Sequence, residues 1–290
     1  MCRFALYLGE EVRLGKLITE PANSIIHQSF HSHERAEPLN GDGFGVTWYP
    51  PDAEEPPATF RSTTPAWANQ NLREVARVTT TRCMLAHVRA ATPGLPVIEV
   101  NCHPFVHGRL AFMHNGSVGG FHALRRALLS ELSDETFGAI EGTTDSEHVF
   151  ALALDALRGL DAVHDDDADP TERLGRALEG AIAATERLRR AAAPDRPSLL
   201  NLALSDGTRA AVTRWSSGPE VGNSLHYCTG RVYHCDEGLC RMEDEGPTGS
   251  AVIVASEPLD EDPRWVPVEP DHLVLVDEAL GVTTRHIALP

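Results

Sequence analysis

The chain carries little positive charge for its size. Its 290 residues include 25 Lys and Arg against 42 Asp and Glu, which gives a formal net charge of −17 at pH 7. A phosphate backbone or an anionic membrane surface repels such a chain unless its basic residues gather in one patch. The basic residues are scattered here, apart from short clusters such as Arg125 with Arg126 that are typical of solvated helix faces. We therefore expect neither nucleic acid nor a membrane as a partner.

Long apolar runs are also missing. No stretch approaches the ~20 residues that a membrane-spanning helix needs. The sequence also does not open with the basic, apolar and small-residue regions of a secretory signal. The hydrophobic content of 42% is nevertheless ample for a sizeable core. These features predict a globular protein of enzyme size that is located in the cytoplasm.

Cysteine is scarce, with six residues in the chain. This number does not make a disulfide scaffold in a chain of this length, and reduced thiols are the default in the cytoplasm. Three of the cysteines gather with two histidines in one segment, which contains His226, Cys228, His234, Cys235 and Cys240. Their spacing includes no C-x-x-C pair and matches none of the common structural zinc patterns, which favours small residues in a hairpin-rich region. We expect no metal and no cofactor.

Apolar periodicity predicts strands at both ends of the chain and helices in its middle. The expected strands span 2–8, 46–49, 83–88, 109–113, 199–204, 210–215, 224–227, 252–255 and 273–276. The expected helices span 68–78, 121–132, 144–157 and 171–193, with Thr143 or Thr144 as a cap of the third. Segments rich in proline and acids predict a surface loop at 50–57 and a solvated linker near 161–170. This order of elements favours a layered α+β domain over a parallel sheet.

Four short motifs place polar residues where a predicted strand ends or a predicted helix begins. They are Cys2, HVRAAT from residue 87, HNG from residue 114 and TTDSE from residue 143. Each motif has an ordinary explanation on its own. Asn115 with Gly116 is the commonest two-residue hairpin turn, and Asp145 is a first-turn acid that the helix dipole favours. A lone cysteine near a terminus is usually a small apolar residue.

Taken together, the motifs supply the parts of an amide-cleaving site. A thiol that attacks an amide carbonyl needs a base, donors for the oxyanion and charges that hold the substrate. Once Met1 is removed, Cys2 carries an α-amine with an unperturbed pKa of about 7.7 to 8.0, which can accept the thiol proton. Asn115 offers a side-chain N–H and Gly116 a backbone N–H, and we expect both on one tight turn.

Two further residues carry opposite charges. Arg89 can bind a carboxylate bidentately, and Asp145 can hold an ammonium group. One cation and one anion in the same pocket suit the zwitterionic head of an α-amino acid.

The motifs also resemble those of a known family. In order, MCRF, NGDGFG, HVRAAT, NCHPF, FMHNG and TTDSE are similar to the class II glutamine amidotransferases, which are N-terminal-nucleophile hydrolases. The resemblance implies an α+β fold, a four-layered αββα sandwich with two stacked antiparallel sheets. We expect residues 2–290 to form a single domain of this type, with the linker near 161–170 on its surface.

The resemblance also implies roles for individual residues. Cys2 is the mature first residue and the nucleophile. The oxyanion hole is formed by Asn115 and Gly116. The residues that bind a γ-glutamyl substrate are Arg89, Thr92, His103 and Asp145. Arg89 holds the α-carboxylate and Asp145 the α-amino group, whereas a plain packing role for His103 stays equally open.

A narrower resemblance extends over most of the chain. PANSIIHQSF, TPAWANQNL, SLHYCTGRVYH and VIVASEPL are similar to a small branch of stand-alone amidotransferase-like proteins. That branch includes the ergothioneine-pathway γ-glutamyl hydrolase and the amidotransferase-like subunit of a cytosolic glutathione-degrading complex. Because the fold and its loops would use up the 290 residues, we expect no synthase domain that would receive ammonia in this chain.

We therefore expect a γ-glutamyl amidohydrolase. Cys2 attacks the γ-carbonyl of glutamine or of a γ-glutamyl conjugate, a thioester forms, and water releases glutamate. Two alternatives stay open. In the first, the chain would be a glutaminase subunit that supplies ammonia to a separate synthase. In the second, it would be an inactive scaffold subunit. The complete set of site residues disfavours the second alternative. A protein partner, either a peptidase or a synthase subunit, also stays open.

Overall fold

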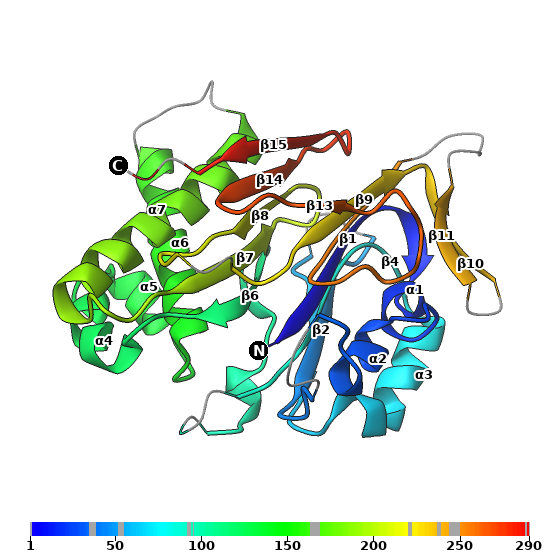
Figure 1. Ribbon diagram of the computed structural model, residues 1–290, viewed down its shortest axis with the longest axis horizontal. Coiled ribbons are helices and arrows are strands. Elements are labelled where there is room, and N and C mark those ends of the chain that lie inside the picture. Colours follow the sequence, from blue (N-terminus) through cyan, green and yellow to red (C-terminus); the bar gives the residue numbers. More distant parts are fainter. Residues whose placement is uncertain are drawn as a thin grey trace.

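Two stacked antiparallel sheets lie between two layers of helices (Figure 1). The computed structural model describes residues 2–34, 39–51, 55–91, 94, 96–162, 169–219, 222–236, 239–243, 250–287 and 289. Three apolar clusters fill the spaces between the four layers. The four-layered αββα sandwich expected from the sequence is confirmed. Across the described ranges, no helix combines the length and the apolar character needed to cross a bilayer.

The first sheet has seven strands in the order β13-β9-β12-β1-β4-β2-β3. Their bounds are β1 (Arg3–Arg13), β2 (Phe44–Trp48), β3 (Ala58–Ser62), β4 (Thr80–Val88), β9 (His226–Gly230), β12 (Ala251–Ala255) and β13 (Val266–Pro267). Side chains alternate between the two faces of a strand. In β1, Phe4 and Leu6 therefore face the second sheet, while Ala5 and Tyr7 face the helices. The first strand of the chain thus lies in the middle of the sheet and is buried on both faces.

The second sheet has six strands in the order β15-β14-β8-β7-β6-β5. They are β5 (Phe105–His107), β6 (Leu110–Ser117), β7 (Leu199–Ser205), β8 (Ala210–Arg214), β14 (His272–Val276) and β15 (Val282–His286). A tight turn joins β5 to β6, since Gly108 has a φ of 56° and His107 pairs with Leu110. Glycine adopts this left-handed backbone conformation without strain.

The helices α1 (Gly15–Ile18), α2 (Ile25–Phe30) and α3 (Gln70–Val78) pack on the outer face of the first sheet. A short 3-10 turn, η1 (Ala66–Ala68), precedes α3, and another, η2 (Glu99–Asn101), precedes β5. The side chain of Asn69 accepts a hydrogen bond from the backbone N–H of Leu72 at 2.8 Å. This N-cap explains why α3 begins where it does.

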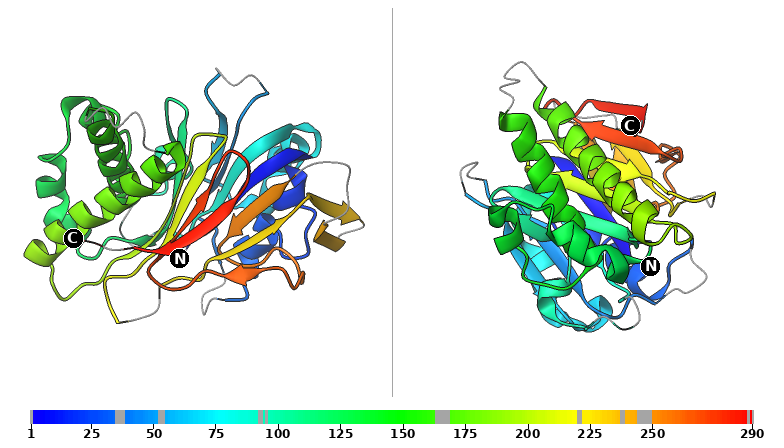
Figure 2. Two further views of the ribbon diagram at one scale, coloured as in Figure 1. Left: turned by 90° about the horizontal axis from the view of Figure 1, so that it is seen from above. Right: turned by 90° about the vertical axis from the view of Figure 1, so that its left-hand side faces the viewer.

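The helices α4 (Phe121–Leu129), α5 (Asp134–Gly138), α6 (Asp145–Ala162) and α7 (Pro170–Ala192) lie on the side of the second sheet. The turned views show the long pair α6 and α7 covering that face (Figure 2). Asp169 caps α7 by accepting from the N–H of Thr171, and Pro170 occupies its first turn, where a missing N–H does no harm. All four predicted helices are present, with ends shifted by a few residues.

Several details differ from expectation. The expected linker near 161–170 is partly helical, because α6 continues to Ala162 and α7 begins at Pro170, while residues 163–168 lie outside the described ranges. The loop expected at 50–57 is followed at once by β3, which the sequence pattern did not indicate. Within that loop, residues 52–54 also lie outside the described ranges.

The cysteine-containing segment forms a hairpin, β10 (Val232–Asp236) and β11 (Leu239–Glu243). Its register places Cys235 opposite Cys240, and a disulfide joins them. The expectation of reduced thiols is therefore wrong for this pair, because opposite positions of a hairpin bring two side chains within bonding reach. The expectation of a hairpin in this segment is confirmed.

Candidate active site

Cys2 lies at the beginning of β1, where the chain enters the centre of the first sheet. In Figure 1 this end of β1 stands between the two groups of helices. Arg3 pairs with Val88, so Cys2 comes beside the end of β4, and its thiol donates to the carbonyl of Ala90 at 3.7 Å. The residue is 8% exposed. Met1, whose removal the sequence predicts, lies outside the described residues.

The NGDGFG motif forms a loop that is hydrogen-bonded to the HVRAAT motif. Asp42 donates its N–H to the carbonyl of Arg89 at 3.0 Å, and Arg89 donates its N–H to the carbonyl of Gly43 at 2.9 Å. Gly43 has a φ of 115°, and a Cβ there would meet the thiol of Cys102 at 2.7 Å. Only glycine fits this position, so two motifs that are distant in sequence lie next to each other and next to Cys2.

Arg89 is buried without a carboxylate partner among the described residues. The residue is only 3% exposed, and its guanidinium donates a hydrogen bond to the backbone carbonyl of Asp42 at 3.5 Å. The Asp42 carboxylate instead accepts from the N–H of Ala91 at 2.8 Å. A buried charge is unfavourable unless it is paired. The guanidinium is therefore suited to bind an anion from outside the chain.

Asn115 and Gly116 lie within β6 and not in a tight turn, so that expectation is wrong. They pair with Asn201 and Leu200 of β7. A Cβ on Gly116 would lie 1.8 Å from the carbonyl oxygen of Leu199, so glycine is required by the close approach of the neighbouring strand. Long-range strand pairing overrides the local preference for a turn at this position.

Ser256, which follows β12, ties Asn115 to the strand that carries Cys2. Its hydroxyl accepts from the N–H of Phe4 at 3.1 Å and from the side-chain amide of Asn115 at 3.3 Å. Its own N–H donates to the carbonyl of Phe4 at 2.9 Å. Asn223 adds a hydrogen bond to the carbonyl of Asn115 at 3.0 Å. The Asn115 amide is thereby fixed close to the beginning of β1.

The residue after Ser256 forms a buried ion pair. The Arg3 guanidinium lies 2.5 Å from the Glu257 carboxylate, with their side chains 2% and 1% exposed. Arg3 also donates to the carbonyl of Cys2 at 3.0 Å. Glu257 accepts two more hydrogen bonds, from the hydroxyl of Ser32 at 2.6 Å and from the N–H of His33 at 2.8 Å. The pair thus anchors the backbone on which the Cys2 thiol is carried.

The pKa of Glu257 reflects these partners. Burial alone would raise the pKa, but the hydrogen bond from Ser32, the charge of Arg3 and the hydrogen bond from His33 outweigh it, so the pKa lies below its usual value. The carboxylate is therefore ionised at neutral pH. Sequence reasoning missed both Arg3 and Glu257, because their pairing joins residues 254 positions apart and no local pattern contains it.

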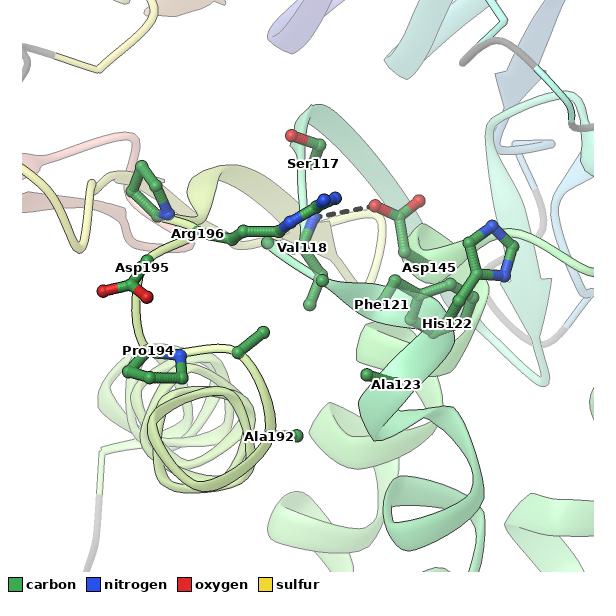
Figure 3. A pocket seen from close by; sticks show the side chains of 14 residues that line it. Ser117, Val118, Phe121, His122, Ala123, Asp145, Ala192, Pro194, Asp195 and Arg196 are labelled. Carbon is green, nitrogen blue, oxygen red and sulfur yellow. Dashed lines mark hydrogen bonds between the residues drawn. The ribbon is translucent and has the colours of Figure 1, made fainter.

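Asp145 begins α6 and points back toward the end of β6. One carboxylate oxygen accepts from the N–H of Val118 at 2.8 Å, and the other accepts from the N–H of Ser146 at 2.9 Å (Figure 3). The N–H of Glu147 donates to the hydroxyl of Thr144 at 3.3 Å, which confirms Thr144 as a cap. Asp145 is 9% exposed and forms no salt bridge with a described basic residue.

A cavity of about 710 Å³ reaches Asp145 from outside. It is lined by residues 117–123, by Asp145 and by residues 192–197, and the side chain of Arg196 extends toward Asp145 in Figure 3. Neither Cys2 nor Arg89 is among the lining residues. The cavity therefore gives access to Asp145 from the side of the second sheet.

His114 connects Asp145 with the strand of Asn115. Its Nε2 donates to the carbonyl of Leu199 at 2.9 Å, because a carbonyl oxygen can only accept. The Nδ1 atom therefore accepts from the hydroxyl of Ser146 at 2.9 Å. Burial lowers the pKa of His114, against the opposing effect of the Asp145 charge. The ring is a neutral positioning group.

His103 lies in the buried layer beneath the site. Its ring stacks on that of His87 with 4.2 Å between the ring centroids and contacts the edge of Phe105. Burial lowers the pKa of His87 to about 3 and holds the pKa of His103 well below its usual range. His87 donates to the carbonyl of His114 at 3.2 Å, whereas both ring nitrogens of His103 lack hydrogen bonds to described residues. Thr92 lies outside the described residues.

Comparison with known proteins gives a consistent result. The family model of the class II glutamine amidotransferases matches residues 17–287. The chain is 41% identical, over 89% of its length and 76% of the relative's, to the probable glutamine amidotransferase DUG3 of Saccharomyces cerevisiae. It is 31% identical, over 98% and 99% of the two chains, to the γ-glutamyl-hercynylcysteine sulfoxide hydrolase of Mycolicibacterium smegmatis.

A solved structure agrees with these sequence relatives. The glutamine aminotransferase class-II domain protein of Silicibacter pomeroyi is 31% identical and superimposes with a TM-score of 0.65 over 99% of each chain. The whole layered architecture, and not a part of it, is therefore shared with that protein.

We expect a Glu257→Gln substitution to lower the free energy of unfolding by about 3–5 kcal/mol at pH 7, because it leaves the buried Arg3 charge without its partner. The lowered pKa of Glu257 makes this stabilisation complete above the unfolded pKa of about 4.3 and progressively weaker as the pH falls through the folded value. The difference in denaturation midpoint between the two proteins should therefore shrink below about pH 4.

The matched control is Glu74→Gln, which breaks the exposed pair of Glu74 with Arg77. Its effect should stay at or below about 1 kcal/mol at every pH. Equal losses in the two variants at pH 7 would contradict a stabilising role for the buried pair.

Proposed function

The chain belongs to the class II glutamine amidotransferases, and we propose that it is a γ-glutamyl amidohydrolase with Cys2 as its nucleophile. Its relatives by sequence include a probable glutamine amidotransferase and a hydrolase whose name specifies a γ-glutamyl substrate. The family match begins at residue 17, so the role of Cys2 rests on the geometry around the beginning of β1.

The proposed reaction begins after Met1 has been removed. The α-amine of Cys2 takes the thiol proton, and the thiolate attacks the γ-carbonyl carbon of the substrate. The oxyanion accepts hydrogen bonds from Asn115 and Gly116. Asn115 has a second side-chain N–H beyond the one directed at Ser256. The α-ammonium then protonates the leaving amine, a γ-glutamyl thioester remains, and water cleaves it to glutamate while the thiol is restored.

The observation that carries this proposal is the buried, unpaired charge of Arg89. Arg89 lies beside Cys2 in the register of β1 and β4, and it is 3% exposed without a carboxylate partner in the described chain. Asp145 is a second buried charge, of opposite sign, and its carboxylate accepts from the backbone N–H groups of Val118 and Ser146. We propose that Arg89 binds the α-carboxylate and Asp145 the α-ammonium group of the γ-glutamyl head. For Thr92 and His103 we propose contact with the same pocket.

The proposal extends to the organisation of the chain. We propose that residues 2–290 form one domain, because β1 pairs on one side with β4 and on the other with β12, from opposite ends of the sequence. A cytoplasmic location and a peptidase or synthase partner stay predictions. The leaving group is ammonia when the substrate is glutamine, and it is the amine when the substrate is a larger γ-glutamyl conjugate. A glutaminase subunit that supplies ammonia to a synthase is the second candidate, favoured by the name of the yeast relative.

We expect an electrophilic glutamine analogue to label Cys2 alone. Intact-mass measurement should show a chain that lacks Met1 and carries one adduct, and peptide mapping should place the adduct on Cys2. The Cys2→Ala variant should lose labelling and more than about 1,000-fold of the activity, since the nucleophile is removed. Cys102→Ala is the matched control, because Cys102 is also a buried thiol of this region, and it should keep the label. Full activity in a chain that retains Met1 would refute the mechanism.

An Arg89→Ala substitution should lower kcat/KM for γ-glutamyl substrates by about 10- to 100-fold, the equivalent of one lost charge-assisted hydrogen bond. The comparison substrate is 4-aminobutanamide, which has the amide but lacks the α-carboxylate. Wild type and variant should cleave this analogue at similar, slow rates. Equal fold losses on both substrates would show that Arg89 acts on the fold and not on the carboxylate.

A panel of γ-glutamyl compounds scored for glutamate release separates the candidates. We expect the isolated chain to release glutamate from γ-glutamyl conjugates such as glutathione and not from the isomers with an α-glutamyl linkage, in which the amine is attached to the wrong carbonyl. Exclusive turnover of glutamine, rising on addition of a co-purified partner, would instead support the glutaminase subunit. Release from none of the compounds would contradict both.

A further inference from the structure

Three histidines gather at the end of α2, outside the candidate active site. His27 lies in the last turn of the helix, His31 follows four residues later, and His33 comes two residues beyond it. The centroids of the rings of His27 and His31 are 5.3 Å apart, those of His31 and His33 are 5.3 Å apart, and those of His27 and His33 are 6.2 Å apart. One ring nitrogen from each residue lies within 4.8 Å of the others.

The backbone brings these side chains together for a definite reason. Residues separated by four positions lie on the same face of a helix, and the N–H of His31 still bonds to the carbonyl of His27 at 2.9 Å. His33 is fixed by its own N–H, which donates to the Glu257 carboxylate at 2.8 Å. The convergence of the rings therefore follows from ordered backbone on both sides of the cluster and not from chance rotamers.

The three rings have no other task in the described chain. None of them forms a hydrogen bond or a salt bridge with a described residue, and His31 and His33 are exposed. Neutral imidazoles are poor partners for one another and good ligands for a metal ion.

We propose that His27, His31 and His33 form a binding site for a divalent transition-metal ion, with zinc as the reference ion. Three imidazole nitrogens select zinc, copper, nickel or cobalt over magnesium and calcium, which prefer oxygen. Bond lengths of about 2.0 to 2.1 Å bring the nitrogens of a tetrahedral zinc site to about 3.3 Å from one another. Small rotations of the two exposed rings supply that approach. The fourth position is left to water or to an external ligand.

The proposed metal site is connected to the beginning of β1 through hydrogen bonds, although the ion would not contact Cys2. Ser32 and His33 both bond to Glu257, and Glu257 pairs with Arg3, which donates to the carbonyl of Cys2. An ion that joins His27 to His31 and His33 would hold the segment 31–33 on α2. It would thereby restrict the part of the chain that encloses the Glu257 carboxylate. The site is independent of the proposed hydrolase chemistry and assigns the ion no part in it.

Calorimetric titration of the chelator-treated full chain with zinc chloride tests the proposal. We expect one zinc ion per chain and binding at least about tenfold weaker in His31→Ala and in His33→Ala. Both residues are exposed, so these variants should keep the melting temperature of the wild type without metal. His234→Ala removes an exposed histidine of β10 and is the matched control, which should bind zinc like the wild type. Magnesium should not compete.

The pH dependence gives a second readout that does not involve activity. Zinc binding requires deprotonated imidazoles, so the affinity should fall as the pH is lowered below about 6.5. Zinc binding that is absent in the wild type, or that is unchanged in the His31→Ala and His33→Ala double variant, would overturn the proposal.

Discussion

The buried pair of Arg3 and Glu257 is the interaction on which the site depends. Chain ends usually fray unless they are tied into the fold. A nucleophile close to the start of the chain therefore needs interactions that fix its position. Here the second residue of the sequence begins the central strand of a sheet, and the next side chain forms an ion pair that is shielded from solvent. The Glu257 carboxylate also accepts hydrogen bonds from Ser32 and His33, so that both of its oxygens have donors.

Pairing and burial account for several of the ionisable groups around the site. Arg3 and Glu257 neutralise each other, and the imidazoles of His87 and His103 are kept uncharged by burial. Arg89 and Asp145 are both buried, and neither forms a salt bridge with a described residue. A zwitterionic head group would complete the pairing of both, which is why we propose an amino-acid substrate and not a neutral amide.

The sequence predicted the layers well and the contacts within the site less well. Alternation and helical periodicity are local properties, so β1, β4, β6 and the four long helices could be recognised from short windows. The turn at Asn115 and Gly116 was predicted from the same local statistics and was wrong, because pairing with β7, about 85 residues away, decides the backbone there. Ser256 and Glu257 act on Phe4 and Arg3 across more than 250 positions, and no local pattern contains that information.

The position of β12 beside β1 has a consequence for how the protein is made. Ala5 pairs with Ala255, so one side of β1 stays open until the chain has been made to a point 250 residues further on. Ser256 and Glu257, which fix Asn115 and Arg3, arrive at the same late moment. A nascent chain therefore has an accessible amino terminus for processing but no assembled site. Full pairing of β1 and the fixing of Arg3 therefore both have to wait until β12 and the residues after it have been made.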